Sequence, residues 1–519
     1  MDLYVFATSD VHGYIGPTDY LANSKSTNLG LAKAAGVIES VRQQHEHVIY
    51  IDNGDLIQGS ALAQYLALYY PEKGPHALVD CLNRMGCDVG VIGNHEFNFG
   101  RAYMDKGLHD ATFPILGANI LKESTGEPAF QPYAIIERQG IRIGVLGLVT
   151  EFVPRWEKSA HIKGLRFANP VETAARWVPI IREKADIVIV SYHGGFERDP
   201  ETGESISLQK GENVACALVD EVPGIDALIT GHQHRQMCGI YKNVPFVMPG
   251  WRAEALGLIH LCLEKGADGS YQVACHDACL LNSGHVEPNP DIMAAIGPLA
   301  QEVEEWLDQP IGRVEGDMEI RDPIFARSHM HPYVDFVNRL QMQVSGVDIS
   351  CTAIFNAQSS GLPETVTVRN IVNNYVYANT LAVLDVSGED LKKALERCAA
   401  FYKINEDGSL GISDAFAKPF IQYYNYDMYS GIDYTMDIRK PVGERIVQLL
   451  YHGEPVHADQ QLKIVMNNYR AVGGGEYPMY GKEKVVQDIQ VDMADLIVEY
   501  IVHNPVIKAQ QSNNLQVLY

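Results

Sequence analysis

The sequence lacks the segments that direct a chain into or across a membrane. Its first residues, Met1 to Phe6, contain no basic residue and lead straight into a polar motif, so no secretory signal is recognised. No apolar run reaches the roughly 18 residues that a membrane-spanning helix needs. The residues before Tyr519 do not form an anchor signal. We therefore expect a cytoplasmic protein with no membrane partner.

Positive charge is also scarce. The chain has 41 Lys and Arg residues against 65 Asp and Glu residues, a formal net charge of −24. Such a surface repels polyanions, which argues against long nucleic acid as a partner. A small phosphorylated molecule can still bind where metal cations and local dipoles outweigh the distant charge.

The cysteines show no paired pattern. There are nine, an odd number, and they are scattered along mostly apolar segments. We therefore expect reduced, buried thiols, as in a cytosolic protein. Cys275-His276-x-x-Cys279 could form half of a zinc site, but no second Cys/His pair completes it, so a structural role is favoured.

The length and the periodic patterns predict two α/β domains. At 519 residues the chain is too long for one core, because single cores stop growing at about 250–300 residues. In the first half, short apolar runs alternate with helical periodicity at 31–41 and 171–181, which is typical of a layered α/β domain. The runs expected as strands are 3–8, 48–51, 89–92, 115–117, 143–148, 187–191, 227–230 and 246–248.

The pattern changes after residue 248 and indicates the domain boundary. Residues 259–263 and 271–275 predict a hairpin that closes the first domain. A helical pattern covers 291–306, with a kink expected at Gly297-Pro298. The second half predicts strands at 347–352, 381–386 and 461–466 and a helix at 391–402. The predicted organisation is a first domain at 1–282, a connecting helix and linker at 283–330, and a smaller α/β domain at 331–519.

Polar residues follow five of the predicted strands in the first domain. In chain order the segments are Ser9-Asp10-Val11-His12-Gly13, Asp52-Asn53-Gly54-Asp55, Gly93-Asn94-His95-Glu96, Ser191-Tyr192-His193-Gly194-Gly195 and Thr230-Gly231-His232-Gln233-His234. Because the carboxyl ends of parallel strands meet at one edge of a sheet, we expect these segments to line one crevice.

These side chains suit two divalent cations. We predict that Asp55 bridges the two ions and that the remaining ligands divide into Asp10, His12 and His234 for one and Asn94, His193 and His232 for the other. Carboxylate, imidazole and amide ligands together favour manganese, iron or zinc over magnesium or calcium. Any single segment is a weak signal, since a lone histidine is most often structural. A chance gathering of so many unpaired polar groups would be costly.

The ordered series resembles the calcineurin-like metallophosphoesterase superfamily. With a second domain attached, Gly93-Asn94-His95-Glu96-Phe97 is similar to the 5′-nucleotidase and 2′,3′-cyclic-nucleotide phosphodiesterase family, over essentially the whole chain. The resemblance implies a four-layer α/β/β/α metal domain and a C-terminal domain that holds the nucleoside. It also implies that His95, together with Asn94, stabilises the transition state or the leaving oxygen.

Two segments of the second half, 423–434 and 467–475, are similar to the base-binding segments of this family. The resemblance implies that one aromatic ring from each segment stacks on the base, and the register assigns Tyr426 and Tyr469. The alternative is that both are ordinary core residues, because the chain contains 27 tyrosines.

Two positions depart from the 5′-nucleotidases. Asn98 stands where many of them have an Asp that orients the motif histidine, and an amide cannot raise the imidazole's proton affinity by charge. In the stretch whose Arg binds phosphate, Asn356 is retained as a substrate-binding residue but the Arg position is Gly361. A monoester dianion needs more positive charge than a cyclic diester monoanion. Both departures therefore favour cyclic diesters, or substrates outside the standard nucleotides.

The sequence therefore predicts a metal-dependent hydrolase of nucleotide phosphoesters that favours 2′,3′-cyclic nucleotides. No covalent intermediate is expected, because two neighbouring cations can activate a water directly. A 5′-nucleotidase or nucleotide-sugar hydrolase is the alternative, since base stacking recognises the nucleoside and not the ester. A catalytically inactive metal- and nucleotide-binding protein is disfavoured, because every ligand position is intact.

Overall fold

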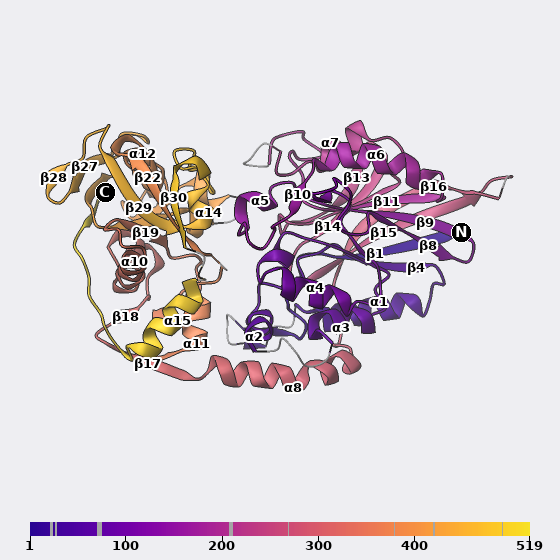
Figure 1. Ribbon diagram of the computed structural model, residues 1–519, viewed down its shortest axis with the longest axis horizontal. Helices are drawn as coiled ribbons and strands as arrows, with labels where there is room; N and C mark the ends of the chain where they lie inside the picture. Colours follow the sequence, from indigo (N-terminus) through magenta and orange to yellow (C-terminus); the bar gives the residue numbers. More distant parts are fainter. Residues whose placement is uncertain are drawn as a thin grey trace. The chain divides into compact units, whose positions relative to one another are not determined.

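The computed structural model describes every residue except 21–23, 26–27, 70–74, 207–210, 268, 378, 419–420, 490 and 492. The chain divides into two compact units, Met1–Val303 and Glu304–Tyr519, each with its own hydrophobic core (Figure 1). Within the described residues, no helix combines the length and the apolar content that crossing a membrane requires.

The first unit contains two six-stranded sheets. One has the order β16-β15-β1-β4-β5-β6 and the other β13-β14-β12-β11-β9-β8. The strands of the first sheet are β1 (Asp2–Thr8), β4 (Val48–Asp52), β5 (Val89–Val91), β6 (Ile115–Leu116), β15 (Ala255–Lys265) and β16 (Tyr271–Asn282). Those of the second are β8 (Tyr133–Arg138), β9 (Ile141–Val149), β11 (Ile187–His193), β12 (Ala227–Thr230), β13 (Gln236–Tyr241) and β14 (Val244–Pro249). All eight predicted strands of the first half are present.

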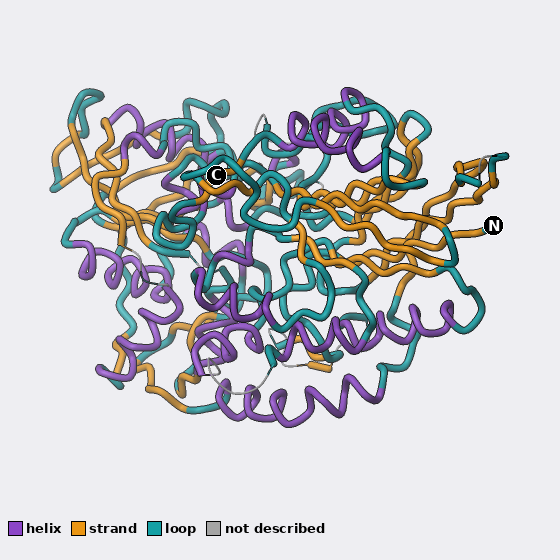
Figure 2. The backbone as a smooth tube through the Cα atoms, turned by 45° about the vertical axis from the view of Figure 1, so that its right-hand side comes forward, coloured by secondary structure: helices purple, strands orange, loops and turns teal. Residues whose placement is uncertain are grey.

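The two sheets share one core and have helices outside them. Val5 and Ile51 of one sheet belong to the same buried cluster as Val145 of the other. Figures 1 and 2 show the strands running together between two groups of helices. These are α6 (Pro170–Arg182) and α7 (Ala215–Glu221) on one side, and α1 (Leu31–Arg42), α3 (Ala77–Arg84) and α4 (Arg101–His109) on the other. This is the expected α/β/β/α arrangement.

Local sequence explains where α6 begins. The side chain of Asn169 accepts hydrogen bonds from the backbone N–H groups of Val171 and Glu172, and Pro170 occupies the first turn, where its missing N–H costs nothing. The helix then buries Val171, Ala174, Val178 and Ile181 at helical spacing against the second sheet.

The second unit begins earlier than predicted. Helix α8 (Pro290–Leu307) covers the predicted helical segment and contains Pro298, the position of the predicted kink, in its interior. Strand β17 (Pro310–Glu315) then pairs with β21 (Thr365–Thr367) and β31 (Val506–Lys508). Part of the segment predicted as linker is therefore a sheet strand of the second unit.

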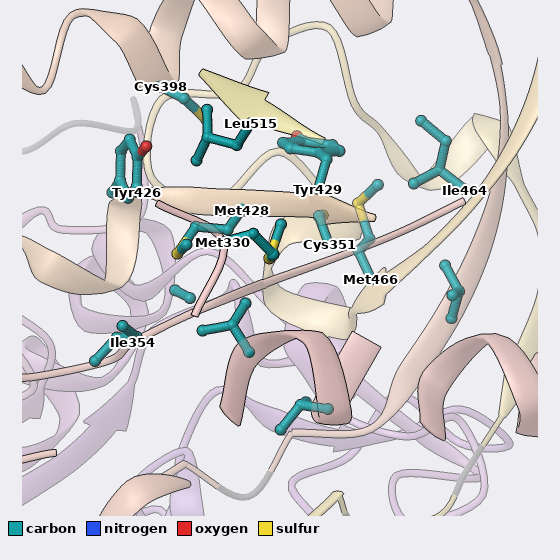
Figure 3. Close-up of a cluster of buried hydrophobic side chains, with 14 of the residues drawn as sticks. Met330, Cys351, Ile354, Cys398, Tyr426, Met428, Tyr429, Ile464, Met466 and Leu515 are labelled. Atoms are coloured by element: carbon teal, nitrogen blue, oxygen red, sulfur yellow. The ribbon is translucent and has the colours of Figure 1, made fainter. Parts of the chain in front are cut away.

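The second unit is a smaller α/β domain around a five-stranded sheet. Its order is β25 (Asp427–Ser430), β19 (Ser350–Ala353), β29 (Gln461–Asn467), β22 (Leu381–Ser387) and β30 (Val485–Ile489). The predicted helix after β22 is α12 (Gly388–Ala399), which starts with a capping box between Ser387 and Asp390. Figure 3 shows part of the core, where Cys351, Met428 and Met466 lie near one another.

The prediction that all cysteines are reduced is wrong at one pair. Cys262 on β15 and Cys275 on β16 face each other across the hairpin and form a disulfide, with Cα atoms 4.9 Å apart. Two residues 13 positions apart became direct neighbours because the hairpin register aligns them.

Candidate active site

The structure brings together the predicted metal ligands from both sheets of the first unit. The ligand atoms of Asp10, His12 and His234 all lie within 4.8 Å of one another, and so do those of Asp10, Asp55 and His193. The amide oxygen of Asn94 lies 3.2 Å from His193 Nε2 and 2.9 Å from His232 Nδ1. Segments from five strand ends thus meet at one place.

The backbone at the ligands is held in an unusual conformation. Twelve described non-glycine residues have positive φ, and five of them are predicted ligands: Asp10, His12, Asp55, His232 and His234. Positive φ disfavours residues with a Cβ atom, so the surrounding structure must hold these turns in place. Such a concentration of strained residues is typical of a functional site.

Two glycines permit this close packing. A Cβ atom at Gly93 would lie 2.2 Å from Asp55 Oδ1, and one at Gly231 would lie 2.0 Å from Ser9 Oγ. Any side chain at either position would displace the ligand loops.

Hydrogen bonds fix which nitrogen each histidine presents. His12 Nδ1 donates to Gln58 O at 2.8 Å and His193 Nδ1 donates to Asn53 O at 2.6 Å, so both present Nε2 to the site. His232 is reversed, because its Nε2 donates to Glu212 Oε1 at 3.0 Å and its Nδ1 faces Asn94. Such partners set the tautomer and the ring orientation of a metal-binding histidine.

The charge of His193 stabilises those of Asp10 and Asp55 and is stabilised by them, whereas a charge on His12 is disfavoured. Burial raises the pKa of Asp10, but His193 and His234 lower it to about 2 overall. Burial likewise opposes ionisation of Asp55, yet His193 and His95 hold its pKa well below the usual range. Burial and His234 lower the pKa of His12 to about 3. Burial also disfavours the charged form of His193, but Asp55 and Asp10 raise its pKa to about 10.

This group of atoms fits divalent cations. Asp55 Oδ2 is buried and accepts no hydrogen bond, although it lies 3.0 Å from His193 Nε2. The Nε2 atoms of His12 and His234 lie 3.0 Å apart, close enough for one ion to bind both. Carboxylate and imidazole groups that converge in this way, with an unused buried oxygen, match the ligands of a dinuclear metal centre.

His95 is oriented through Asn98. Its Nδ1 donates to Asn98 Oδ1 at 2.5 Å, and Asn98 Nδ2 donates to Glu157 Oε2 at 2.6 Å. Glu157 is nearly buried and also binds His161. Asn98 thus lies between His95 and the carboxylate of Glu157, which takes the part of the missing Asp through one intervening side chain. The amide oxygen of Asn98 fixes Nδ1 of His95 as the protonated nitrogen.

Glu96 is a site residue to which the sequence analysis gave no role. Its carboxylate is buried and accepts hydrogen bonds from the backbone N–H groups of Asp55, Leu56 and Gly93. Burial and the charge of Asp55 raise the pKa of Glu96. Glu96 therefore holds the loop of Asp55 against the loop of Asn94. Its position in the Gly-Asn-His-Glu segment is the sequence feature that could have indicated this role.

Two tryptophans cover the outer histidines. The ring of Trp156 stacks on His232 with centroids 5.3 Å apart, and that of Trp251 stacks on His234 at 5.2 Å. Neither could be assigned from the sequence, because each lies outside the ligand segments. Each stacked indole limits the rotation of the histidine ring beside it.

We expect Glu212→Gln to weaken metal binding by about 10–100-fold, because the neutral amide supports the His232 tautomer less well than a carboxylate does. Isothermal titration of the metal-free protein with Mn²⁺ measures this. The matched control is Glu197→Gln, since the carboxylate of Glu197 accepts hydrogen bonds from Cys216 N and Ala217 N at the start of α7 and not from a metal-binding histidine. Equal Mn²⁺ affinity in the Glu212 variant and the parent would show that Glu212 does not support metal binding.

The two predicted base-binding tyrosines differ in the structure. Tyr469 is half-buried, as a stacking residue requires. Tyr426 has no exposed surface and lies in the hydrophobic core (Figure 3). Its ring packs against Phe401 and Tyr402, and its hydroxyl donates to Arg327 O. We therefore correct the assignment of Tyr426, which is a core residue.

Tyr424, two residues before Tyr426, lies closer to the surface. It is half-buried, and its ring lies 6.5 Å from that of Tyr469, centroid to centroid. The buried ion pair between Arg470 and Asp427, at 2.6 Å, joins the two segments, and Arg470 also donates to Tyr424 O. The two segments predicted for base binding thus form one cluster.

The phosphate-binding Arg of nucleotidases could not be accommodated at Gly361. Its φ is +69°, and a Cβ atom there would lie 2.0 Å from Met318 O. The side chain of Asn356 accepts hydrogen bonds from Gln358 N and Ser359 Oγ, which shape the preceding loop.

Comparisons with known proteins agree with this geometry. Residues 3–236 match the calcineurin-like phosphoesterase family, and residues 310–482 match the 5′-nucleotidase C-terminal domain. A Haemophilus influenzae 2′,3′-cyclic-nucleotide 2′-phosphodiesterase/3′-nucleotidase is 31% identical over 568 residues, which cover 96% of this chain and 84% of the relative.

Two further relatives are informative. The trifunctional nucleotide phosphoesterase YfkN of Bacillus subtilis is 28% identical over 574 residues, and the chain spans 38% of its length. A Staphylococcus aureus protein assigned as a 5′-nucleotidase, solved in complex with alpha-ketoglutarate, has a TM-score of 0.88 and 36% identity, with 100% of both chains covered.

Proposed function

The chain belongs to the calcineurin-like phosphoesterase family and carries a 5′-nucleotidase C-terminal domain, and from this premise we propose that it hydrolyses 2′,3′-cyclic nucleotides. It is a nucleotide phosphoester hydrolase, and its relatives include cyclic phosphodiesterases that also act as 3′-nucleotidases. The observation that carries the proposal is the convergence of all seven predicted ligands around a buried, unused carboxylate oxygen of Asp55.

The cyclic diester is favoured over the 5′-monoester by the second unit. The backbone at Gly361 excludes the arginine that would balance a monoester dianion. A cyclic diester carries one negative charge and needs less compensation. A 5′-nucleotidase activity remains the second candidate, because the Staphylococcus aureus protein assigned to that activity covers the whole chain.

We further propose that manganese, iron or zinc occupies the site. When bound, two such ions would supply an activated water and positive charge beside the phosphate. The protein's own residues do the rest. Asn94 can donate to a phosphate oxygen. With Nδ1–H of His95 held by Asn98, the doubly protonated ring can donate its second proton, on Nε2, to the departing ribose oxygen.

A substrate panel tests the proposal. With Mn²⁺ added, kcat/KM is measured for 2′,3′-cyclic AMP, 3′-AMP, 5′-AMP and UDP-glucose. We expect the highest value for the cyclic nucleotide. A higher kcat/KM for 5′-AMP or UDP-glucose would show that the cyclic diester is not the preferred substrate. The absence of turnover with every substrate would leave only a binding function.

Nucleotide recognition is expected to depend on Tyr424 and Tyr469. Alanine at either position should weaken binding of 2′,3′-cyclic AMP by about 1–3 kcal/mol, because a stacking surface is lost. Hydrolysis of bis-p-nitrophenyl phosphate should be unchanged, provided that it binds only at the metal site. Phenylalanine should be nearly neutral at both positions. Steady-state kinetics on the two substrates separate these effects.

Tyr426→Ala is the matched control. Because this ring is in the core, its loss should lower the melting temperature and depress both activities alike. If the Tyr424 and Tyr469 variants behaved in the same way, the pair would be structural and not a base platform.

A further inference from the structure

A second group of metal-binding side chains lies at the opposite end of β1 from Asp10. Asp2 begins this strand, and its carboxylate, the imidazole of His260 and the sulfur of Cys262 offer ligand atoms that all lie within 4.8 Å of one another. His260 Nε2 lies 3.0 Å from Asp2 Oδ1. The catalytic chemistry uses none of these residues.

The strand register explains why the group is compact. Asp2 is paired with Cys262 across β1 and β15, and Cys262 is paired with Cys275 across β15 and β16. Directly opposite residues project from the same face of a sheet, and His260, two residues before Cys262, shares that face. The imidazole also stacks on Tyr4, with centroids 4.7 Å apart, which restricts its rotation.

Four potential ligands therefore project from one sheet face: two sulfurs, one imidazole and one carboxylate. All four residues are exposed or half-buried, so an ion can reach them from solvent: Asp2, His260, Cys262 and Cys275. In the structure the two sulfurs are joined as a disulfide and cannot bind a metal as thiolates. The oxidation state of this pair thus decides whether the set is complete.

We propose that reduction of the Cys262–Cys275 disulfide creates a zinc site formed by Asp2, His260, Cys262 and Cys275. A dithiol reductant supplies two electrons and two protons: the Cys262–Cys275 bond breaks, two thiols form, and the reductant becomes a disulfide. Binding of Zn²⁺ then forms two Zn–S bonds and releases the two thiol protons.

The geometry and the ligand types suit zinc. Thiolate and imidazole ligands with one carboxylate are characteristic of tetrahedral zinc. Two sulfurs on one zinc ion are about 3.8 Å apart, given Zn–S bonds of about 2.3 Å. Cys262 and Cys275, with Cα atoms 4.9 Å apart, can separate to this distance by side-chain rotation.

Cobalt absorption distinguishes this site from the catalytic centre, because only thiolate ligands give Co²⁺ a charge-transfer band in the near ultraviolet, and none of the catalytic ligands contains sulfur. The full chain is titrated with Co²⁺ in two forms. One form is untreated, and the other is reduced by a phosphine. The phosphine takes up the oxygen of a water molecule as the disulfide becomes two thiols. The reduced protein is then separated from the reductant without air. We expect the band only in the reduced form, saturating at one Co²⁺ per chain and abolished by Zn²⁺.

The variants assign the ligands. Cys262→Ser and Cys275→Ser should each lose the band. His260→Ala keeps both sulfurs and should instead raise the Co²⁺ concentration at which the band saturates, with circular dichroism confirming the fold of every variant. The matched control is the pair Cys238→Ser and Cys279→Ser, the other cysteines with solvent access, which should retain it. No band in the reduced parent, a band that survives Cys262→Ser, or its loss in the control pair would each overturn the proposal.

Discussion

Replacing Asp55 by alanine is expected to abolish turnover and to reduce the affinity for both metal ions. Asp55 is predicted to bridge the two ions, and its Oδ2 is the buried oxygen that accepts no hydrogen bond. Losing a ligand to both should weaken binding by more than about 100-fold, the upper end of what losing an outer-shell partner costs. Metal analysis after dialysis and a diesterase assay measure the two effects.

Two companion variants make this result interpretable. Asp55 has φ +58°, where alanine is strained, whereas asparagine tolerates this conformation, so Asp55→Asn removes the charge with little change of backbone. Asp52→Asn is the control. Burial raises the pKa of Asp52 to about 7, so this carboxyl group is already partly protonated near neutral pH. If Asp55→Asn retained two ions and full activity, the bridging role would be wrong.

His95→Ala is expected to lower kcat by roughly 10²–10⁴, the usual contribution of a positioned acid or base, while both metal ions stay bound. The side chain of His95 is half-buried and is held by Asn98, whereas its backbone N–H donates to Asp55 Oδ1 and survives the substitution. Activity and metal content should therefore separate in this variant, in contrast to Asp55→Ala.

The relay behind His95 gives a graded series. Asn98→Ala and Glu157→Gln should lower kcat by roughly tenfold, because each weakens the hydrogen bonds that orient the imidazole of His95 while the imidazole itself stays in place. The KM for the cyclic nucleotide should change little, since neither residue is part of the base-binding cluster. A kcat for His95→Ala within twofold of the parent, with metals retained, would exclude His95 from the reaction.

The sequence by itself predicted which side chains gather at the candidate metal site. Each predicted ligand is the last residue of a buried strand or lies within four residues after it, and the rule that parallel strand ends meet at one edge requires no tertiary information. The two α/β domains followed from local periodicity, which β1, β4, α1 and α6 reproduce within a residue or two. These features are encoded in short, contiguous segments.

The outer partners of the site were decided only by the tertiary structure. Glu212 reaches His232 from 20 residues away, and Glu157 reaches Asn98 across 59. Nothing in their local sequence distinguishes these carboxylates from the other acidic residues of the chain. Their roles arise because loops that are distant in sequence pack together, and a one-dimensional pattern does not record which loops do so.

The tyrosines and the cysteines show the same limit at closer range. Tyr423–Asn425 forms a short 3-10 helix, which breaks the strand alternation and turns Tyr426 into the core while Tyr424 stays half-buried. The hairpin register makes Cys262 and Cys275 partners, although their spacing predicted nothing. A shift of one residue reverses which side chain faces outward, because strand side chains alternate. The sequence therefore determined which residue types reach the site, and only packing and register decided which of two neighbours does so.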